Sequence, residues 1–475
     1  MTRIGLRESA RRIAPLAWPV FVGQVAVLAF STVDTLMAAR ASALDLAALA
    51  VGGAVYISVF VGLMGMILAI GPIAGQLYGA GKLREAGHET QQAAWLALAL
   101  AVPGCAVLLL PEPFLALARS EPAVAAKVRD YLLGLAFALP PALVFTAYRG
   151  FNVAVSRPKA VMALQLGALA LKVPVNAVLV FGAVVPTPFG GWTLPAFGAA
   201  GCGIATAVVM WLQLGAAVWW LRRDPFYRRF GLGRSLVRPS AASQAALLRL
   251  GVPMGLAILV EVTGFTFMAF FVSRIGATAV AGHQIAVNMV SMMFMLPLAI
   301  ANAASTLVAQ RVGAGDAADA RRIGWAGLEI GVVIASVLGS AVYLLREQVI
   351  GLYTANPVIV AAALPLLAWV ALFHIADAAQ TIAAFVLRAY RIAVVPVIVY
   401  VVAVWGVGLA GGYVAAFDLL GISPSWMRGA RGFWSMATLG LAVAALGMSG
   451  FLAGKLRRDW RSDLGVPHPA LQPTR

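Results

Sequence analysis

The chain has 475 residues, of which 62% are hydrophobic and only 11% are charged, and its mean hydropathy is +0.91. Soluble globular domains carry about 25% charged residues, so this composition excludes that class. The net charge of +17 is spread over short loops between apolar runs and does not form one basic patch, which argues against a nucleic-acid-binding protein.

Twelve apolar runs follow one another along the chain, and each is long enough to cross the hydrocarbon core of a bilayer, about 30 Å thick, as a helix. The alternating pattern of about ten residues that marks a membrane β-barrel is missing, so strands are not expected. The predicted fold class is therefore an all-α polytopic membrane protein with twelve transmembrane helices. The predicted spans lie near 13–39, 46–78, 93–117, 127–149, 161–185, 194–221, 246–273, 280–310, 322–345, 358–387, 392–417 and 432–455.

The basic residues divide unevenly between the two sides that this order of spans defines. Because twelve is an even number, both termini and the loop at 222–245 fall on one side. That side collects about three times as many Lys and Arg residues as the other, which is the pattern of the cytoplasmic side. We therefore predict a multi-pass protein of the bacterial cytoplasmic membrane with both termini inside. No cleavage site precedes the first span, so no removable signal peptide is expected.

The two halves of the chain resemble each other. Three motifs of the first half recur in the second half at one spacing of 234 residues (253 − 19). The aligned pairs are Pro19 with Pro253, Arg40 with Arg274, and Gly79 with Gly313. A single spacing without gaps indicates an internal repeat of six spans, the arrangement in which transporters rock one half against the other. The predicted domains are a six-helix lobe at 1–221, a basic cytoplasmic linker at 222–245 and a second six-helix lobe with a short tail at 246–475.

Three acidic residues inside predicted spans stand out, because insertion of a carboxylate there costs about 2.5–3.5 kcal/mol. They are Asp34, Glu261 and Asp377. Glu261 follows Arg249 by 12 residues and Asp377 precedes Arg388 by 11. At a rise of about 1.5 Å per residue, both lie about 17 Å from the cytoplasmic rim, so the two carboxyl groups can meet at the midplane.

Each acid has a structural and a functional interpretation. A buried acid can neutralise itself and hydrogen-bond to a neighbour, and Lys172 and Asn176 share a helix face from which either could reach Asp34. Near Glu261 and Asp377 the basic candidate is a protonated His374. Two close carboxylates in low dielectric cannot both stay ionised without a cation, so this pair is expected to bind H⁺, Na⁺ or an organic cation. A transition-metal site is not expected, because one His with two carboxylates matches no strong ligand spacing.

Flexible thioethers and aromatic rings near these acids suggest a site for apolar cargo. Ordinary packing or contact with lipid explains each such residue, taken singly, somewhat better. The candidates for a substrate cavity are Gln24, Phe265, Met289, Met292 and Gln380.

Several motifs together resemble the MATE (multidrug and toxic compound extrusion) family, and most closely its NorM branch. They are "STVDTLMAAR", "AGQLYGAGK", "YRGFNVAVSRPK", "KVPVNAVLVFG", "VEVTGF", "GHQIAVN", "VAQRVGAGD" and "DAAQTIAAFVLRAYR", and they span nearly the whole chain. The resemblance implies a twelve-helix, two-lobed, V-shaped antiporter that exports cationic, lipophilic drugs or metabolites in exchange for Na⁺ or H⁺. It implies no cofactor other than the coupling ion, and a monomer in the bilayer.

The same resemblance assigns roles to individual residues. Asp34 matches the acid of the amino-terminal lobe, with Asn176 as its companion. Glu261 and Asp377 match the cation site of the other lobe, and would hold Na⁺ if sodium is the coupling ion. Relatives often have an aromatic hydroxyl and a glutamine before the acid of the tenth span, where this chain has Phe373 and His374. The loss of the hydroxyl weakens a Na⁺ site, and histidine titrates near neutral pH, so the coupling ion stays open between H⁺ and Na⁺.

Other functions are less consistent with these residues. A flippase for lipid-linked precursors, from the same broad superfamily, would need a strongly cationic cavity, whereas this midplane is acidic apart from Lys172. A channel would not need paired repeats. A membrane enzyme would need a catalytic constellation, and no nucleophile with an adjacent base is found, so we expect no enzymatic activity. The two cysteines, Cys105 and Cys202, have no C-x-x-C spacing that would indicate a disulfide framework or a metal site.

Overall fold

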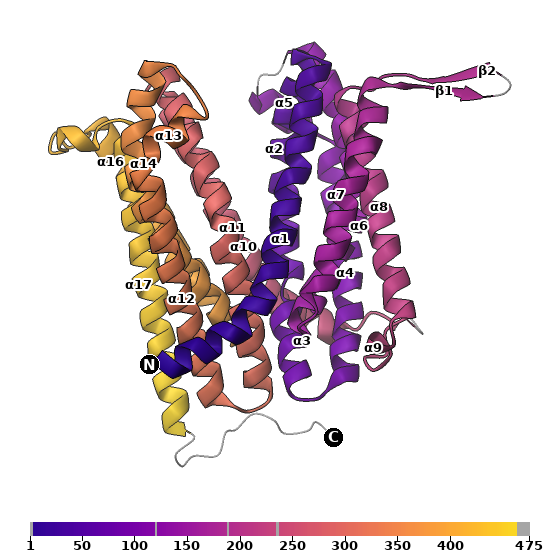
Figure 1. Cartoon of the computed structure of the whole chain (residues 1–475), viewed down its shortest axis with the longest axis vertical. Coiled ribbons are helices and arrows are strands. Elements are labelled where there is room, and N and C mark those ends of the chain that lie inside the picture. Colours follow the sequence, from indigo (N-terminus) through magenta and orange to yellow (C-terminus); the bar gives the residue numbers. More distant parts are fainter. Residues whose placement is uncertain (1–2, 119–120, 188–189, 234–236, 463–475) are drawn as a thin grey trace. The chain divides into compact units, whose positions relative to one another are not determined.

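The computed structural model describes residues 3–118, 121–187, 190–233 and 237–462, and these are almost entirely helical (Figure 1). Twelve helical segments of the described residues are long and apolar enough to cross a membrane. They follow the twelve predicted spans in order, so the all-α, twelve-span fold class is confirmed. The predicted linker at 222–245 includes residues 234–236, and the predicted second lobe includes 463–475; those residues lie outside the described part of the chain.

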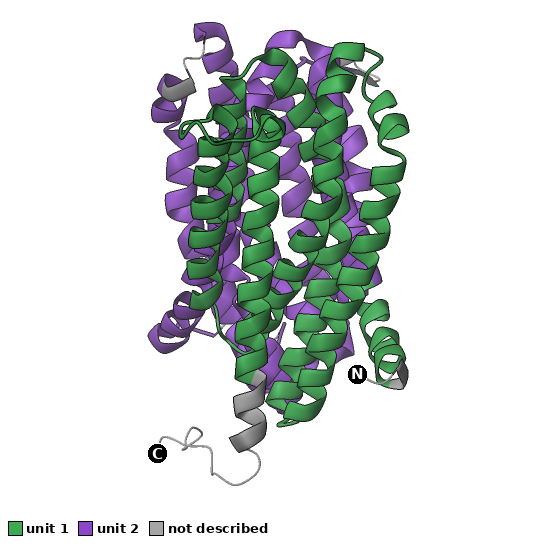
Figure 2. Cartoon of the chain, turned by 90° about the vertical axis from the view of Figure 1, so that its left-hand side faces the viewer, with its two compact units in different colours: residues 1–17, 260–475 green, residues 18–259 purple. Residues whose placement is uncertain are grey.

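The described chain divides into two compact units, coloured separately in Figure 2. Unit 2 comprises residues 18–259, and unit 1 comprises residues 1–17 together with 260–475. Both crossings of the chain fall inside long helices, namely α1 (Arg3–Ala41) and α10 (Ala241–Ser273). These crossings differ from the boundaries at 221 and 246 that the repeat suggests, because the first turns of each repeat pack in the unit formed mainly by the other.

Unit 2 contains the remaining helices of the first half and one β-hairpin. Its elements are α2 (Ala43–Ile67), α3 (Ile70–Gly79), α4 (Leu83–Leu109), α5 (Glu112–Ala118), α6 (Pro122–Ala154), α7 (Pro158–Phe181), β1 (Ala183–Thr187), β2 (Gly190–Leu194), α8 (Ala199–Arg223) and α9 (Pro225–Arg228). The two strands pair antiparallel and project from the ends of α7 and α8 (Figure 1). The expectation of no strands was therefore wrong for this connection, which follows the last turn of α7 at Gly182, where φ is +77°.

Unit 1 contains the helices of the second half. Its elements are α11 (Ala277–Gly313), α12 (Ala317–Leu344), α13 (Arg346–Gly351), α14 (Pro357–Ala389), α15 (Val394–Tyr400), the π-helix η1 (Val401–Ala410), α16 (Gly411–Phe417), the 3-10 helix η2 (Ser425–Met427) and α17 (Ala430–Ser462). α15, η1 and α16 run on without a break, so together they form the eleventh span. A π-helical stretch of ten residues is unusual, since such segments are mostly single turns and are frequent at functional sites.

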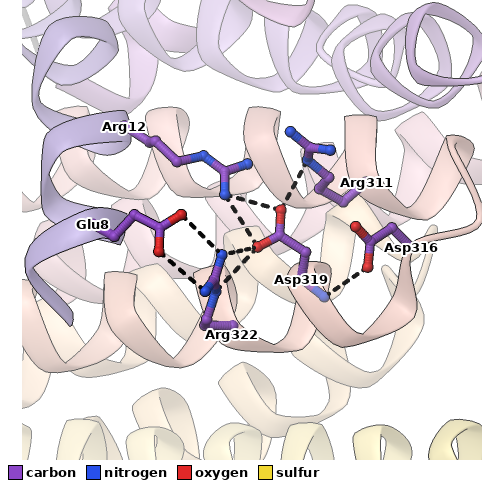
Figure 3. Close-up of polar contacts among 6 residues, drawn as sticks. All are labelled: Glu8, Arg12, Arg311, Asp316, Asp319 and Arg322. Carbon is purple, nitrogen blue, oxygen red and sulfur yellow. Dashed lines mark hydrogen bonds and ion pairs between the residues drawn. The ribbon is translucent and has the colours of Figure 1, made fainter. Parts of the chain in front are cut away.

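The start of α1 is anchored to unit 1 by charge. Asp319, in the first turn of α12, accepts from Arg12 at 2.9 Å, from Arg311 at 3.0 Å and from Arg322 at 2.8 Å (Figure 3). Glu8 adds a second contact to Arg322 at 3.2 Å. One carboxylate thus connects α1, α11 and α12, and it is only 11% exposed, so water competes weakly for these bonds.

The start of α10 is anchored to unit 2 in a different way. The side chain of Gln92 on α4 donates to the Arg238 carbonyl at 2.9 Å and accepts from the Ser240 amide at 2.9 Å. Further along α10, a Cβ on Gly65 of α2 would lie 2.4 Å from the Cα of Gly255, so only glycine permits this approach of α2 to α10. The residues at 238–240 therefore contact α4 within unit 2.

Candidate functional site

Glu261 and Asp377, the two acids predicted to meet, lie in the same unit and interact electrostatically. Glu261 is half-buried on α10, two residues past the end of unit 2 at Leu259, and Asp377 is 3% exposed on α14. Each helix carries its acid within an apolar stretch of high hydropathy. Two carboxyl groups placed together in such surroundings form a site that a cation or a proton can stabilise.

Polar side chains connect Asp377 to the eleventh span. Gln380 donates to the Asp377 carboxylate and to the Thr381 hydroxyl, both at 3.0 Å. The Tyr400 hydroxyl, at the end of α15, donates to the side-chain oxygen of Gln380. Gln380 is 0% exposed and Tyr400 is 2% exposed, so this chain of hydrogen bonds is sealed from solvent. Tyr400 supplies an aromatic hydroxyl in this unit, where Phe373 cannot.

Glu261 has a basic neighbour that sequence reasoning missed. Arg388, next to the end of α14, is 4% exposed and interacts electrostatically with Glu261 and Tyr400. Its guanidinium also lies over the Phe385 ring, with the Cζ atom 4.5 Å from the ring centroid. The arginine side chain is long, so an arginine near the end of a span can reach an acid that lies deeper in the span. This reach is the signal by which sequence reasoning could have found Arg388.

His374 lies one turn before Asp377 on α14 and is 0% exposed. Among the described residues, neither of its ring nitrogens has a hydrogen-bond partner. Phe373 beside it packs edge-on against Phe265 and Trp434, with ring centroids 5.8 Å and 5.5 Å apart. The structure therefore places His374 within the packed interior of unit 1, one turn from Asp377 on α14 but without a hydrogen bond to it.

Asp34, the third acid, lies in unit 2 and forms a separate site. Its carboxylate accepts from Lys172 at 2.9 Å and from Asn176 at 3.0 Å, both on α7. Asp34 is 7% exposed, while Lys172 and Asn176 are 0% exposed. The structure thus brings together both of the α7 residues that the sequence offered as partners, and Lys172 provides the counter-charge.

The remaining cavity candidates differ in exposure. Phe265 and Met289 are partly buried against the apolar core of unit 1, whereas Met292 is 58% exposed. Gln380 belongs to the hydrogen-bond chain of Asp377, and Gln24 is a half-buried residue of α1 in unit 2. The structure does not gather these five side chains into one site within a single unit, since Gln24 belongs to the other one.

The chain is similar to known proteins over nearly its whole length. The model of the MatE family matches residues 19–178 and 253–414, two segments that begin 234 residues apart (253 − 19), as the repeated motifs do. A probable multidrug resistance protein NorM of Aromatoleum aromaticum is 38% identical over 449 residues, with 94% of this chain and 95% of that protein covered. Another, of Chromobacterium violaceum, is 35% identical over 469 residues and covers 98% of each chain.

A solved structure shows the same fold. The crystal structure of the Vibrio cholerae MATE transporter VcmN in the bent form superimposes with a TM-score of 0.84, covering 96% of this chain and 99% of that one. The two sequences are only 16% identical, so this likeness concerns the fold alone.

Proposed function

Since the chain belongs to the MatE family, we propose that it is a secondary active multidrug efflux transporter of the bacterial cytoplasmic membrane. Its cargo would be cationic, lipophilic drugs or metabolites, exported as H⁺ or Na⁺ moves inward, and it would act as a monomer with both termini in the cytoplasm. The names of the relatives, which are multidrug resistance proteins, support the transport of drugs.

The observation that carries the proposal is the pair formed by the half-buried Glu261 and the buried Asp377. Two interacting carboxyl groups within apolar helices raise the free energy of the protein unless a cation or proton is bound. The pair therefore favours binding of a cation or a proton. Arg388 and the chain from Asp377 through Gln380 to Tyr400 position the pair. We propose that this set is the coupling site, with Asp34 and Asn176 a separate acid site in the other unit.

Antiport follows if the cargo and the coupling ion favour different conformations of the protein, one facing inward and one facing outward. A ligand shifts an equilibrium between two conformations only by its difference in affinity for them, and an equal binder shifts nothing. We propose that the two repeats are the lobes that exchange between inward and outward facings. The drug cation would favour one facing, and the coupling ion, bound to the acids, would favour the other.

Both candidate coupling ions suit the carboxyl pair. A proton needs a single carboxylate, while Na⁺ needs several oxygen ligands, of which Glu261 and Asp377 would supply the charged ones. We propose that His374 modulates coupling, because it lies one turn from Asp377 on the same helix. A flippase for lipid-linked anions is less consistent with these sites, since the buried Lys172 is already neutralised by Asp34.

The test is export of ethidium from proteoliposomes, with a Na⁺ gradient and a pH gradient imposed separately. Glu261→Gln and Asp377→Asn remove charge but keep shape, so each variant should fold and lose gradient-driven export. The double variant should be little worse than either single one, because members of one site are not additive. Glu347→Gln, on the exposed surface of α13, is the matched control and should export normally. Normal export by Glu261→Gln would refute the proposed coupling site.

A further inference from the structure

Lys172 lies in a cage of oxygen atoms that fits a primary ammonium group. Its Nζ atom is 2.9 Å from the Asp34 carboxylate, 2.5 Å from the Thr206 hydroxyl and 3.2 Å from the Cys202 carbonyl. The Phe30 ring covers the same atom at 4.6 Å from its centroid. Three acceptors match the three N–H bonds of an ammonium group, and an aromatic face adds cation–π attraction.

The cage is built into the interior of unit 2 by three helices. Phe30 and Asp34 belong to α1, Lys172 to α7, and Thr206 and Cys202 to α8. Lys172 is 0% exposed and Thr206 is 6% exposed, so water does not share these bonds. The other titratable groups that interact with Asp34 are the Cys202 thiol and the Tyr131 hydroxyl of α6, and both are neutral in their usual state.

The charges of the pair cancel, which affects what Asp34 can bind. An unpaired carboxylate at this depth would attract any cation. Asp34, however, is already paired with the Lys172 ammonium group, a cation that belongs to the chain itself. A second cation placed beside the pair would leave one positive charge without a partner in an apolar interior, and that is strongly unfavourable. Asn176 has a buried side-chain oxygen with no hydrogen-bond partner among the described residues, so an acceptor for a further donor remains there.

We propose that Lys172 is a tethered occupant of the amino-terminal acid site, so that Asp34 accepts a cation from outside the protein only after the Lys172 ammonium has moved away. The inference rests on the proposed function for its role in transport, but the cage itself can be tested without it. The ligand class that the cage selects is a primary ammonium on an alkyl chain, because that is the group it holds.

The first experiment empties the cage and refills it. Lys172→Ala removes the ammonium, and n-propylammonium replaces the missing part of the side chain. The thermal midpoint of the purified variant should rise by a few degrees with propylammonium, since a ligand that binds only the folded state stabilises it. Neutral propanol should have no such effect, and propylammonium should not shift the wild-type protein. A variant that responds equally to propylammonium and propanol, or to neither, would overturn the proposal.

A second lysine of the same unit gives a matched control. Lys127 donates to the buried Asp45 carboxylate at 2.6 Å, but its side chain is 35% exposed, so water can replace its ammonium. The thermal midpoint of Lys127→Ala should therefore not rise when propylammonium is added. An equal gain in Lys127→Ala would show a general effect of the amine and would also overturn the proposal.

The second experiment uses Lys172→Met, which removes the charge and keeps the length, and so covers the case that the alanine variant does not fold. Asp34 is then left without its cation, and ethidium should bind the purified protein about tenfold more tightly or better. The double variant Lys172→Met/Asp34→Asn should return to the wild-type affinity. Unchanged binding in Lys172→Met would assign Lys172 a structural role alone. If the wild-type protein exports no ethidium, the proposed function fails, while the propylammonium shift still reports on the cage.

Discussion

The Arg12 guanidinium lies 2.9 Å from the Asp319 carboxylate, although 307 positions of the sequence separate the two residues. This bond fixes the first turns of α1 to the first turn of α12, and Arg311 and Arg322 bind the same carboxylate (Figure 3). A residue near the start of the first repeat therefore contacts a residue of the second repeat.

The ion pairs of Asp319 predict that replacing this one residue strongly destabilises the protein. Asp319→Asn removes the charge that three guanidinium groups share, and the partly buried cluster should lose about 2 kcal/mol of stability. Ser9, which is 0% exposed, should then become accessible in a Ser9→Cys reporter. The measurements are the thermal midpoint in detergent and the rate of thiol labelling.

Glu8→Gln is the control for this prediction, because Glu8 is 54% exposed and contacts only the outer face of Arg322. Its effect should stay within about 0.5 kcal/mol, as expected for exposed pairs. If Glu8→Gln and Asp319→Asn were equally destabilising, the anchoring role of Asp319 would be wrong.

Tyr400 is predicted to support the acid site through Gln380. Tyr400→Phe removes only the hydroxyl that donates to Gln380, and it leaves a buried acceptor unsatisfied at a cost of about 1–3 kcal/mol. Gln380 can then turn away from Asp377, so export should fall by about tenfold, the factor to which 1.36 kcal/mol corresponds. The initial rate of ethidium export in proteoliposomes measures this change.

Tyr353→Phe provides the comparison, because Tyr353 is 41% exposed and lies outside the site. It should export at the wild-type rate with an unchanged thermal midpoint. Equal rates for the two tyrosine variants would remove Tyr400 from the proposed mechanism.

Asp224 gives a prediction with a defined pH range. Partial burial acts to raise the pKa of its carboxyl, but the Phe226 amide at 2.9 Å and the Arg157 guanidinium at 2.5 Å outweigh it and bring the pKa below 3.8. A depressed pKa contributes stability above pH 3.8, which is lost as the pH falls through the folded-state pKa.

Asp224→Asn should therefore lower the free energy of unfolding by about 1 kcal/mol, because a charged helix cap and an exposed ion pair are lost. This difference from the wild-type protein should be constant between about pH 5 and pH 8. It should shrink as the pH falls below 3.8, because the wild-type carboxyl is then protonated too. Chemical denaturation at several pH values measures the difference. A cost that grew on acidification would contradict the assignment.

The sequence was sufficient for the spans and for the three buried acids, because both depend on properties of single segments. An apolar run long enough to cross a bilayer is visible directly, and so is a carboxylate within it. Polar helix ends were less predictable. The third span begins at Leu83 and not near 93, since the polar segment before it is helical and Gln92 binds the chain at 238–240.

The neighbours of the acids could be predicted only in part. Lys172 and Asn176 were found because they lie four residues apart and face one way. Arg388 and Tyr400 were missed because their contacts depend on the packing of α14 against the eleventh span, which the pattern of one segment does not determine. The hairpin was missed because its pairing is short and local, within a stretch whose apolar residues resemble the end of a span.

The placement of the unit crossings inside α1 and α10 bears on the origin of the chain. Residues 3–17 pack with the second half, and the start of α10 up to 259 packs with the first. In a six-helix protein carrying one repeat, the first turns of the leading helix would have no second copy to pack with. Two copies would have exchanged the first turns of their leading helices, as subunits do in a domain-swapped homodimer. Fusion end to end retains that exchange within one polypeptide, so a gene cut at residue 221 would separate each unit from a part of itself.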